Sequence, residues 1–185
     1  MKALFSFFVF LLVLCSACSK KDTNISSSGT LAFTTVIYTL TPLTGGDVVK
    51  LKYTDPDGTG ATSPTITGGK LIKNTSYTGS VSIVNEQPSP AVNVAEDIKA
   101  QNKDYQIFYV PGAGLNLIVR YEDMDDNGLP IGINTTLRTS SASAGNLKII
   151  LKSKPDKAAA NVSLGDITNA GGSTKFEISF PINVE

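Results

Sequence analysis

The stretch Phe176-Glu-Ile178-Ser-Phe180-Pro-Ile182-Asn-Val184 decides the fold, because a large apolar residue stands at every second position. Side chains alternate between the two faces of a β-strand, so this pattern is typical of a strand with one face in a core and the other in water. A helix would place its apolar residues three and four positions apart. The stretch therefore predicts a half-buried strand.

Seven further segments show the same alternation of apolar and polar residues. They follow one another at the spacing that is typical of a β-sandwich. With the first stretch they make about eight strands, which predicts a single all-β domain, an antiparallel β-sandwich. The seven expected strands span 31–43, 48–54, 76–86, 105–110, 115–123, 131–139 and 147–152.

Two short segments predict how the strands are joined. Gly45-Gly46-Asp47 and Asp126-Asn127-Gly128 indicate hairpin turns, because Gly and Asn adopt the positive φ angles that tight turns require. Residues 95–100 are typical of a helix and lie in the long link 85–104. We interpret this link as a crossover from one sheet to the other.

The composition excludes several classes of function. The chain has 185 residues, with 16 Lys+Arg and 16 Asp+Glu, so its formal net charge of zero disfavours a nucleic-acid partner. It has no His and no Trp, and therefore lacks the usual general base, the commonest metal ligand and the best stacking side chain. A Ser-His-Asp triad is not available. We expect a protein that is not an enzyme.

The first residues are typical of a targeting segment. Met1-Lys2 is a short positive start, and residues 4–14 form a continuous apolar run that ends at the small residues 15–18. This run is shorter than the roughly 20 residues of a membrane-spanning helix. The segment therefore predicts a signal peptide.

The end of the leader resembles the lipobox of bacterial lipoproteins, because Ser16-Ala17 stands directly before Cys18. In that motif, cleavage exposes the cysteine, and its sulfur and amine carry acyl chains. Leu14 lies four positions before Cys18 instead of the usual three, and Cys15 is unsuited as acceptor because the bulky Leu14 precedes it. The alternative is an ordinary secretory signal that leaves Cys18 as a free thiol.

Cysteine usage favours the lipid-anchor interpretation. Cys15 is lost with a leader of 1–17, so Cys18 is the one thiol of the mature chain and no intramolecular disulfide is expected. Residues 18–29 are rich in Ser and charge, which predicts a flexible tether behind the lipidated cysteine. The expected β-sandwich domain is 30–185. We therefore expect palmitate on Cys18 and a membrane as partner.

Leu71, Thr75 and Tyr77 resemble the tyrosine corner of fibronectin type III domains, in which these residue types have this spacing. The resemblance implies an immunoglobulin-like or fibronectin III-like sandwich. It also implies that the Tyr77 phenol caps backbone where a core strand begins, which is a structural role.

A resemblance to known proteins spans nearly everything after the tether. It is carried by the lipid-attachment start and by residues 71–77, 82–86, 105–109, 123–132 and 165–172. In these features the chain resembles a poorly characterised family of small envelope lipoproteins from Gram-negative bacteria. Members are sometimes labelled as having a type 1 periplasmic binding fold, which needs two α/β lobes, whereas the strand pattern here predicts one all-β domain. The resemblance implies location and fold, and no ligand or reaction.

One acidic turn is a candidate calcium site. Asp123, Asp125, Asn127 and Gly128 stand at the first, third, fifth and sixth places of an EF-hand loop, where oxygen ligands converge on Ca²⁺. The twelfth place holds Asn134 in place of the bidentate Glu, and both flanks indicate strands. The alternative is a hairpin turn whose Asp and Asn side chains hydrogen-bond local backbone. No other cofactor is indicated.

A second acidic turn, Asp55-Pro-Asp-Gly-Thr-Gly60, is interpreted as a loop that follows a strand. Paired carboxylates such as Asp123 and Asp125 are the groups that glycosidases use, yet catalysis needs them opposed across a pocket. A hydrolase with acidic loops is therefore the third-ranked hypothesis, together with a calcium-dependent adhesion module.

The leading hypothesis is a lipid-anchored β-sandwich of the cell envelope with a non-enzymatic binding or structural role. We expect it in the outer membrane, on the periplasmic or the surface face. The alternative is an accessory lipoprotein of an outer-membrane uptake or secretion complex, whose envelope protein partner pairs with an edge strand.

Overall fold

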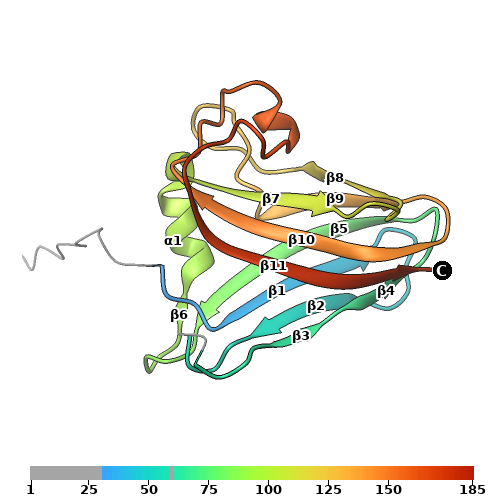
Figure 1. Ribbon diagram of the computed structural model, residues 1–185, viewed down its shortest axis with the longest axis horizontal. Coiled ribbons are helices and arrows are strands. Elements are labelled where there is room, and N and C mark those ends of the chain that lie inside the picture. Colours follow the sequence, from blue (N-terminus) through green and yellow to red (C-terminus); the bar gives the residue numbers. More distant parts are fainter. Residues whose placement is uncertain (1–30, 59–60) are drawn as a thin grey trace, which may run out of the picture.

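The computed structural model describes residues 31–58 and 61–185 of the chain. Two β-sheets face each other across a shared apolar layer (Figure 1). The expected signal peptide, Cys18 and the tether 18–29 lie outside the described residues. The structure confirms an all-β sandwich, whereas its assignment to the immunoglobulin or fibronectin III type stays a prediction.

The larger sheet has seven strands in the order β3-β2-β1-β5-β9-β8, with β6 paired to β5 beside this path. All the pairings in it are antiparallel. Its strands are β1 (Thr35–Pro42), β2 (Val49–Thr54), β3 (Thr65–Thr67), β5 (Ser76–Asn85), β6 (Val92–Asn93), β8 (Leu117–Tyr121) and β9 (Asn134–Thr139).

The smaller sheet has four strands in the order β4-β11-β10-β7. The β4 strand is parallel to β11, and the other two pairings are antiparallel. Its strands are β4 (Gly69–Leu71), β7 (Tyr105–Pro111), β10 (Ser143–Ser153) and β11 (Ser173–Val184). Three short helices complete the described elements: α1 (Val94–Ala100), η1 (Asn102–Asp104) and η2 (Val162–Leu164).

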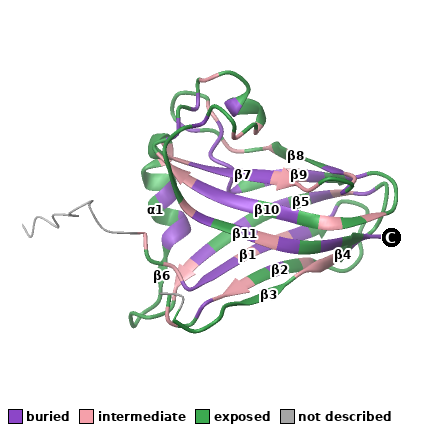
Figure 2. Ribbon diagram, viewed as in Figure 1, coloured by how far each residue is buried: buried purple, intermediate pink, exposed green. Residues whose placement is uncertain are grey.

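The core lies between the inner faces of the two sheets, and buried and exposed residues alternate along the strands (Figure 2). The five apolar side chains of the 176–184 stretch are all buried. Burial of each such side chain contributes about 1.5–3 kcal/mol. The larger sheet opposes them with Tyr38, Leu40, Tyr77, Ile83 and Leu137, which are at most 1% exposed.

The chain changes sheets between β3 and β4, where Gly68 lies against β11. A Cβ atom at this position would overlap the backbone of Pro181. Glycine is therefore required, because only a residue without a side chain permits so close an approach of two backbone segments.

The link 85–104 is the crossover that the sequence predicts, because it joins β5 of the larger sheet to β7 of the smaller one. Asn93 is the N-cap of helix α1, and its side-chain oxygen accepts a hydrogen bond from the Ala95 N–H at 3.1 Å. Val94, Ala95 and Ile98 are buried in the common core. The helix therefore closes one end of the sandwich (Figure 1).

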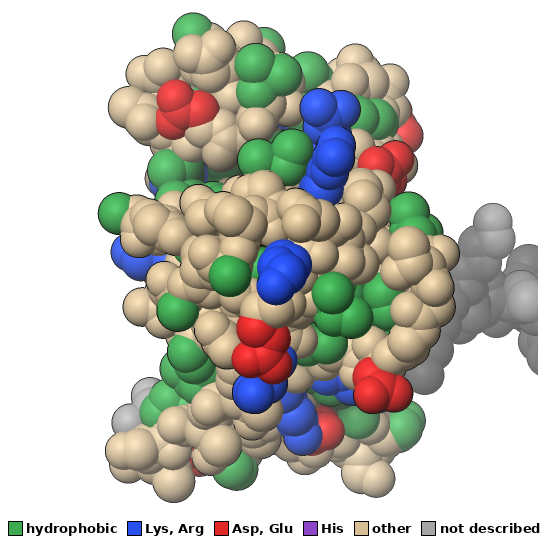
Figure 3. Space-filling model, turned by 90° about the vertical axis from the view of Figure 1, so that its right-hand side faces the viewer, with side chains coloured by type: hydrophobic (Ala, Val, Ile, Leu, Met, Phe, Trp, Pro, Cys, Tyr) green, Lys and Arg blue, Asp and Glu red, His purple; other side chains and the backbone are tan. Residues whose placement is uncertain are grey.

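Strand register assigns every loop to one of two ends. The helix end holds α1, the start of β1, residues 55–58 and 61–64, and the loops 122–133 and 154–172. The opposite end, called the C-terminal end, holds the end of β11 and the turns 43–48, 72–75, 112–116 and 140–142. Figure 3 shows this C-terminal end, on which hydrophobic side chains lie in separate patches among polar ones.

All eight strands predicted by alternation are present, and both predicted hairpin turns join paired strands, β1 with β2 and β8 with β9. Some predicted bounds are wrong. The strand expected at 131–139 begins only at Asn134, because the Ile131 carbonyl accepts the Ile107 N–H of β7 at 2.8 Å. The sequence also missed β3, β4 and β6, which are too short to show a period of two.

Leu71, Thr75 and Tyr77 surround the turn from β4 to β5. Tyr77 is 1% exposed, and its hydroxyl oxygen accepts a hydrogen bond from the Ile72 N–H at 2.8 Å. The Thr75 hydroxyl donates to the Lys73 carbonyl at 3.0 Å, and Leu71 is buried. The phenol thereby binds the turn that carries the chain from the smaller sheet to the larger.

We expect Tyr77→Phe to lower the free energy of unfolding by about 1–2 kcal/mol, because the Ile72 N–H then loses its acceptor. Urea denaturation measures this change. Tyr105→Phe is the matched control, since Tyr105 is half-buried and its hydroxyl makes no hydrogen bond to a described residue. Equal stability of the Tyr77 variant and the parent would contradict the structural role of this phenol.

Candidate functional site

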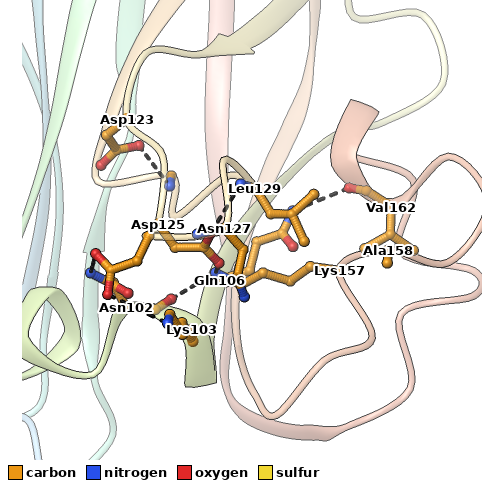
Figure 4. Close-up of polar contacts among 12 residues, drawn as sticks. Asn102, Lys103, Gln106, Asp123, Asp125, Asn127, Leu129, Lys157, Ala158 and Val162 are labelled. Carbon is orange, nitrogen blue, oxygen red and sulfur yellow. Dashed lines mark hydrogen bonds and ion pairs between the residues drawn. The ribbon is translucent and has the colours of Figure 1, made fainter.

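The loop 122–133 joins β8 to β9 and carries the three predicted metal ligands Asp123, Asp125 and Asn127 (Figure 4). Its tip is a turn in which Gly128 has a φ of 75° and Met124 pairs with Pro130. Only a residue such as glycine adopts this φ without strain. The predicted acidic turn is therefore a hairpin between two strands.

Asp123 organises the return of this loop into β9. Its Oδ1 accepts a hydrogen bond from the Gly132 N–H at 2.8 Å. Its Oδ2 accepts from the N–H groups of Ile133 and Asn134 at 2.9 and 3.0 Å. All three bonds come from backbone, so the carboxylate fixes the bend that directs the chain into the strand.

Asp125 organises the tip of the loop. Its Oδ1 accepts hydrogen bonds from the N–H groups of Asn127 and Leu129, at 2.8 and 3.0 Å. Its Oδ2 lies 2.9 Å from the Nζ atom of Lys157. The side chains of this pair are only 1% and 3% exposed, so the structure contains a buried ion pair.

Lys157 comes from a different part of the chain, the loop 154–172 between β10 and β11. Its ammonium also donates to the Asn102 carbonyl in η1 at 2.7 Å. One cation therefore joins three segments at the helix end: η1, the acidic turn and the loop 154–172 (Figure 4). A weaker contact supports the junction, because Asp126 accepts a hydrogen bond from the Asn102 side chain at 3.2 Å.

Burial and hydrogen bonding act in opposite directions on this pair. Burial alone would raise the pKa of the Asp125 carboxyl, but two backbone N–H groups and the Lys157 ammonium outweigh it and lower that pKa below its ordinary value. Burial lowers the pKa of Lys157, and the Asp125 carboxylate opposes this effect. The carboxylate is therefore held in its charged form by bonds that it already makes.

The loop 154–172 covers the outer face of β7 and β10. Val162 and Ala170 of the loop pack with Phe108 of β7 and Ile150 of β10 in a second apolar cluster. The Gln106 amide donates to the Val162 carbonyl at 3.1 Å. This loop buries the outward face of β7 and holds Lys157 in position over the acidic turn.

Two polar atoms near this loop are buried without a hydrogen-bond partner among the described residues: Gln106 Oε1 and the Tyr121 hydroxyl. Burial raises the pKa of Tyr121 to about 12, and the neighbouring Gln106 amide opposes this shift. Tyr121 therefore remains a neutral phenol over the whole physiological range.

The second acidic turn lies at the same helix end but on the other side of the sheet, because β1, β5 and β9 separate β2 from β8. Asp55 is 5% exposed and accepts a hydrogen bond from the Tyr53 hydroxyl at 3.4 Å. Asp57 accepts from the Thr62 N–H at 2.7 Å. The described part of this segment, residues 55–58, forms a turn directly after β2, as the sequence predicts.

The chemistry available at the acidic turn is set by what the carboxylates already bind. Asp123 and Asp125 accept backbone N–H and ammonium donors, as in the hairpin interpretation of this turn, and they do not face each other across a pocket. In the described part of the chain no three Asp, Glu or Cys side chains are grouped to hold a metal ion. Calcium binding at this turn stays one of two alternative predictions, and the hairpin turn with carboxylates bonded to local backbone is the other.

Sequence reasoning missed Lys157 and Asn102. They lie 32 and 23 positions from Asp125, and neither stands in a local pattern that indicates burial. Only the fold of the loop 154–172 brings the lysine to the turn. A lysine between Asp156 and Ala158 would ordinarily be assigned to solvent.

Comparisons of the chain with protein-family models, curated proteins and solved structures find no match. Within residues 31–58 and 61–185, none of the helices has the length and apolar character needed to cross a membrane.

We expect Lys157→Met to lower the free energy of unfolding by about 3–5 kcal/mol, because it leaves the Asp125 carboxylate buried and unpaired. The double variant Lys157→Met/Asp125→Leu should lose much less than the sum of the two single changes, since it removes both charges. Chemical denaturation of the four proteins measures the coupling. Lys148→Met is the matched control, because its ion pair with Glu177 is half exposed and contributes at most about 1 kcal/mol. Additive losses would contradict a coupled pair.

We expect millimolar Ca²⁺ to leave the melting temperature unchanged, because the Asp123 and Asp125 oxygens already accept hydrogen bonds from five backbone N–H groups and from the Lys157 ammonium. Thermal unfolding with and without Ca²⁺ measures this, with Mg²⁺ as control. A rise in the parent protein that is lost in Asp125→Ala would establish the EF-hand-like interpretation instead.

Proposed function

We propose that this protein is a lipid-anchored β-sandwich of the cell envelope, held in the outer membrane by acyl chains on Cys18. Its role is binding or structural association, and not catalysis. The observation that supports the lipid anchor is the Ser16-Ala17-Cys18 sequence, which follows an eleven-residue stretch, 4–14, with ten apolar residues. Two or more acyl chains on one residue suffice for stable attachment, whereas one chain binds only marginally.

The position at which the chain joins the sandwich supports this proposal. The first described residues join the fold at the helix end, where the Thr34 N–H donates to the Val84 carbonyl at 2.9 Å. The tether of residues 18–29 spans at most about 40 Å when fully extended. An anchor attached here leaves both sheet faces and the C-terminal end free to meet a ligand or partner.

The use of the acidic groups supports a role other than catalysis. A glycosidase needs two carboxylates that face a substrate across a pocket. The carboxylates of Asp123 and Asp125 instead accept hydrogen bonds from backbone N–H groups and from Lys157, so they stabilise loops. Their removal should affect folding and not a chemical step.

A second candidate is an accessory lipoprotein of an outer-membrane uptake or secretion complex. The observation that favours it is the edge of the larger sheet at β8, a strand that pairs with β9 alone among the described strands. The opposite edge strand, β3, has only three residues. An extended segment of an envelope protein could therefore add to β8. Pull-down with the anchored chain tests this alternative.

We expect labelled palmitate to enter the full chain when it is expressed in a Gram-negative host, and mass spectrometry to find Cys18 as the acylated first residue. Cys18→Ser should abolish the label. Cys15→Ser is the matched control, and it should retain the label because residue 15 leaves with the leader. A parent chain that keeps Met1, or one with an unmodified Cys18 thiol, would overturn the anchor.

A further inference from the structure

The outer face of the larger sheet carries rows of hydroxyl side chains. Side chains that point outward from adjacent strands line up across a sheet, so the register defines the rows. One row runs through Thr41, Thr78 and Thr136, from β1 across β5 to β9. The next row runs through Thr39, Ser80 and Asn134 on the same strands. Along these two rows the outer face of the larger sheet is therefore polar, and it is not an apolar patch.

These two rows line a shallow groove of about 360 Å³. Glu122, which directly follows β8, also lines the groove and accepts a hydrogen bond from the Thr136 hydroxyl at 2.6 Å. The hydroxyls of Thr39, Thr41 and Ser80 make no hydrogen bond to a described residue. Donors and acceptors along the groove are therefore available to a ligand.

Basic side chains flank the groove on both sides. Lys50 and Lys52 project from the same face of β2, and Arg120 and Arg138 from β8 and β9. All four are exposed, and none forms an ion pair with a described residue. On the smaller sheet, by contrast, the exposed Lys148 is paired with Glu177 at 2.6 Å. Glu122 is the acidic side chain of the groove itself, so the face has an excess of positive charge.

The other side chains of this face restrict the class of ligand. The groove is lined by Thr, Ser, Asn, Gly and Glu and contains no aromatic ring on which a nucleic-acid base would stack. The outward apolar residues Ile37 and Ile118 lie outside the groove lining, so it lacks the apolar centre typical of a protein interface. Rows of hydroxyl side chains with cations on both sides suit a ligand polymer that is rich in hydroxyl groups and bears carboxylates.

We propose that this groove binds an acidic polysaccharide, whose hydroxyl groups exchange hydrogen bonds with the Thr and Ser rows. The sugar carboxylates pair with Arg120 and Arg138, since a guanidinium binds a carboxylate through two parallel hydrogen bonds. Outward side chains lie about 5 Å apart on adjacent strands and about 7 Å apart along one strand, so one extended sugar chain contacts several hydroxyls. The inference gives a ligand to the binding role proposed above, and it does not require the lipid anchor.

Calorimetric titration of the full-length chain in neutral detergent with alginate, a carboxylated polysaccharide, tests the proposal. We expect alginate to bind, dextran of similar length to bind at least about tenfold more weakly, and added salt to weaken alginate binding. Arg120→Gln/Arg138→Gln should weaken alginate binding by about tenfold or more, because two charged hydrogen-bonding groups are lost. Lys148→Gln, on the other sheet, is the matched control and should bind as the parent does.

A second variant tests the hydroxyl rows separately. Thr39→Val/Thr41→Val keeps β-branched side chains in β1 and removes two hydroxyls that make no hydrogen bond to a described residue, so the fold is preserved while binding of alginate and dextran falls together. The melting temperature of each variant shows that it is folded.

Three results would overturn the proposal. The first is absence of alginate binding by the parent chain, and the second is equal weakening by the Arg variants and by Lys148→Gln. The third is Arg-dependent binding to anionic phospholipid vesicles without binding to alginate, which would assign this face to a membrane. None of these results bears on palmitate at Cys18, so failure here and failure of the proposed anchor are distinguishable.

Discussion

Two sheets share a single apolar layer, and this constraint governs the rest of the structure. Neither sheet can bury its inner face alone, so the chain changes sheets repeatedly, through Gly68, the turn 72–75, helix α1 and the turns 112–116 and 140–142. Each change must satisfy backbone groups at an end of the sandwich. Helix α1 does so at the helix end and the Tyr77 phenol at the other end. The loops are therefore parts of the fold.

Charge is used in two different ways in this molecule. At the helix end, Lys157 and Asp125 are buried together, and the pair holds the loop 154–172 against the acidic turn. Burial of a charge is costly unless it is paired and hydrogen-bonded, so these groups are committed to structure. On the outer face of the larger sheet, Arg120 and Arg138 remain in water without an acidic partner among the described residues. The exposed and unpaired cations are the ones available for recognition.

The fold was predictable to the extent that it depends on local alternation. The long strands can be recognised in the sequence because buried apolar residues alternate with less buried ones, as from Phe176 to Val184. Strands β3, β4 and β6 have only two or three residues and show no period. They exist because neighbouring strands offer unpaired backbone groups at the right place. The strand expected from Ile131 fails for a similar reason, because its carbonyl bonds to β7 of the other sheet.

The candidate site also has a part that the local sequence predicts and a part that depends on the tertiary structure. The amino-acid sequence by itself determined that Asp123, Asp125 and Asn127 lie on one turn between two strands, since spacing and turn chemistry are local properties. The tertiary structure alone decided that Lys157 and the Asn102 carbonyl meet that turn, and that Thr and Ser residues of three strands line one groove. Both depend on register and on loop packing over long separations in the chain. The junction at Lys157 and the groove are stabilised by contacts between residues far apart in the sequence, so no single stretch of sequence predicts them.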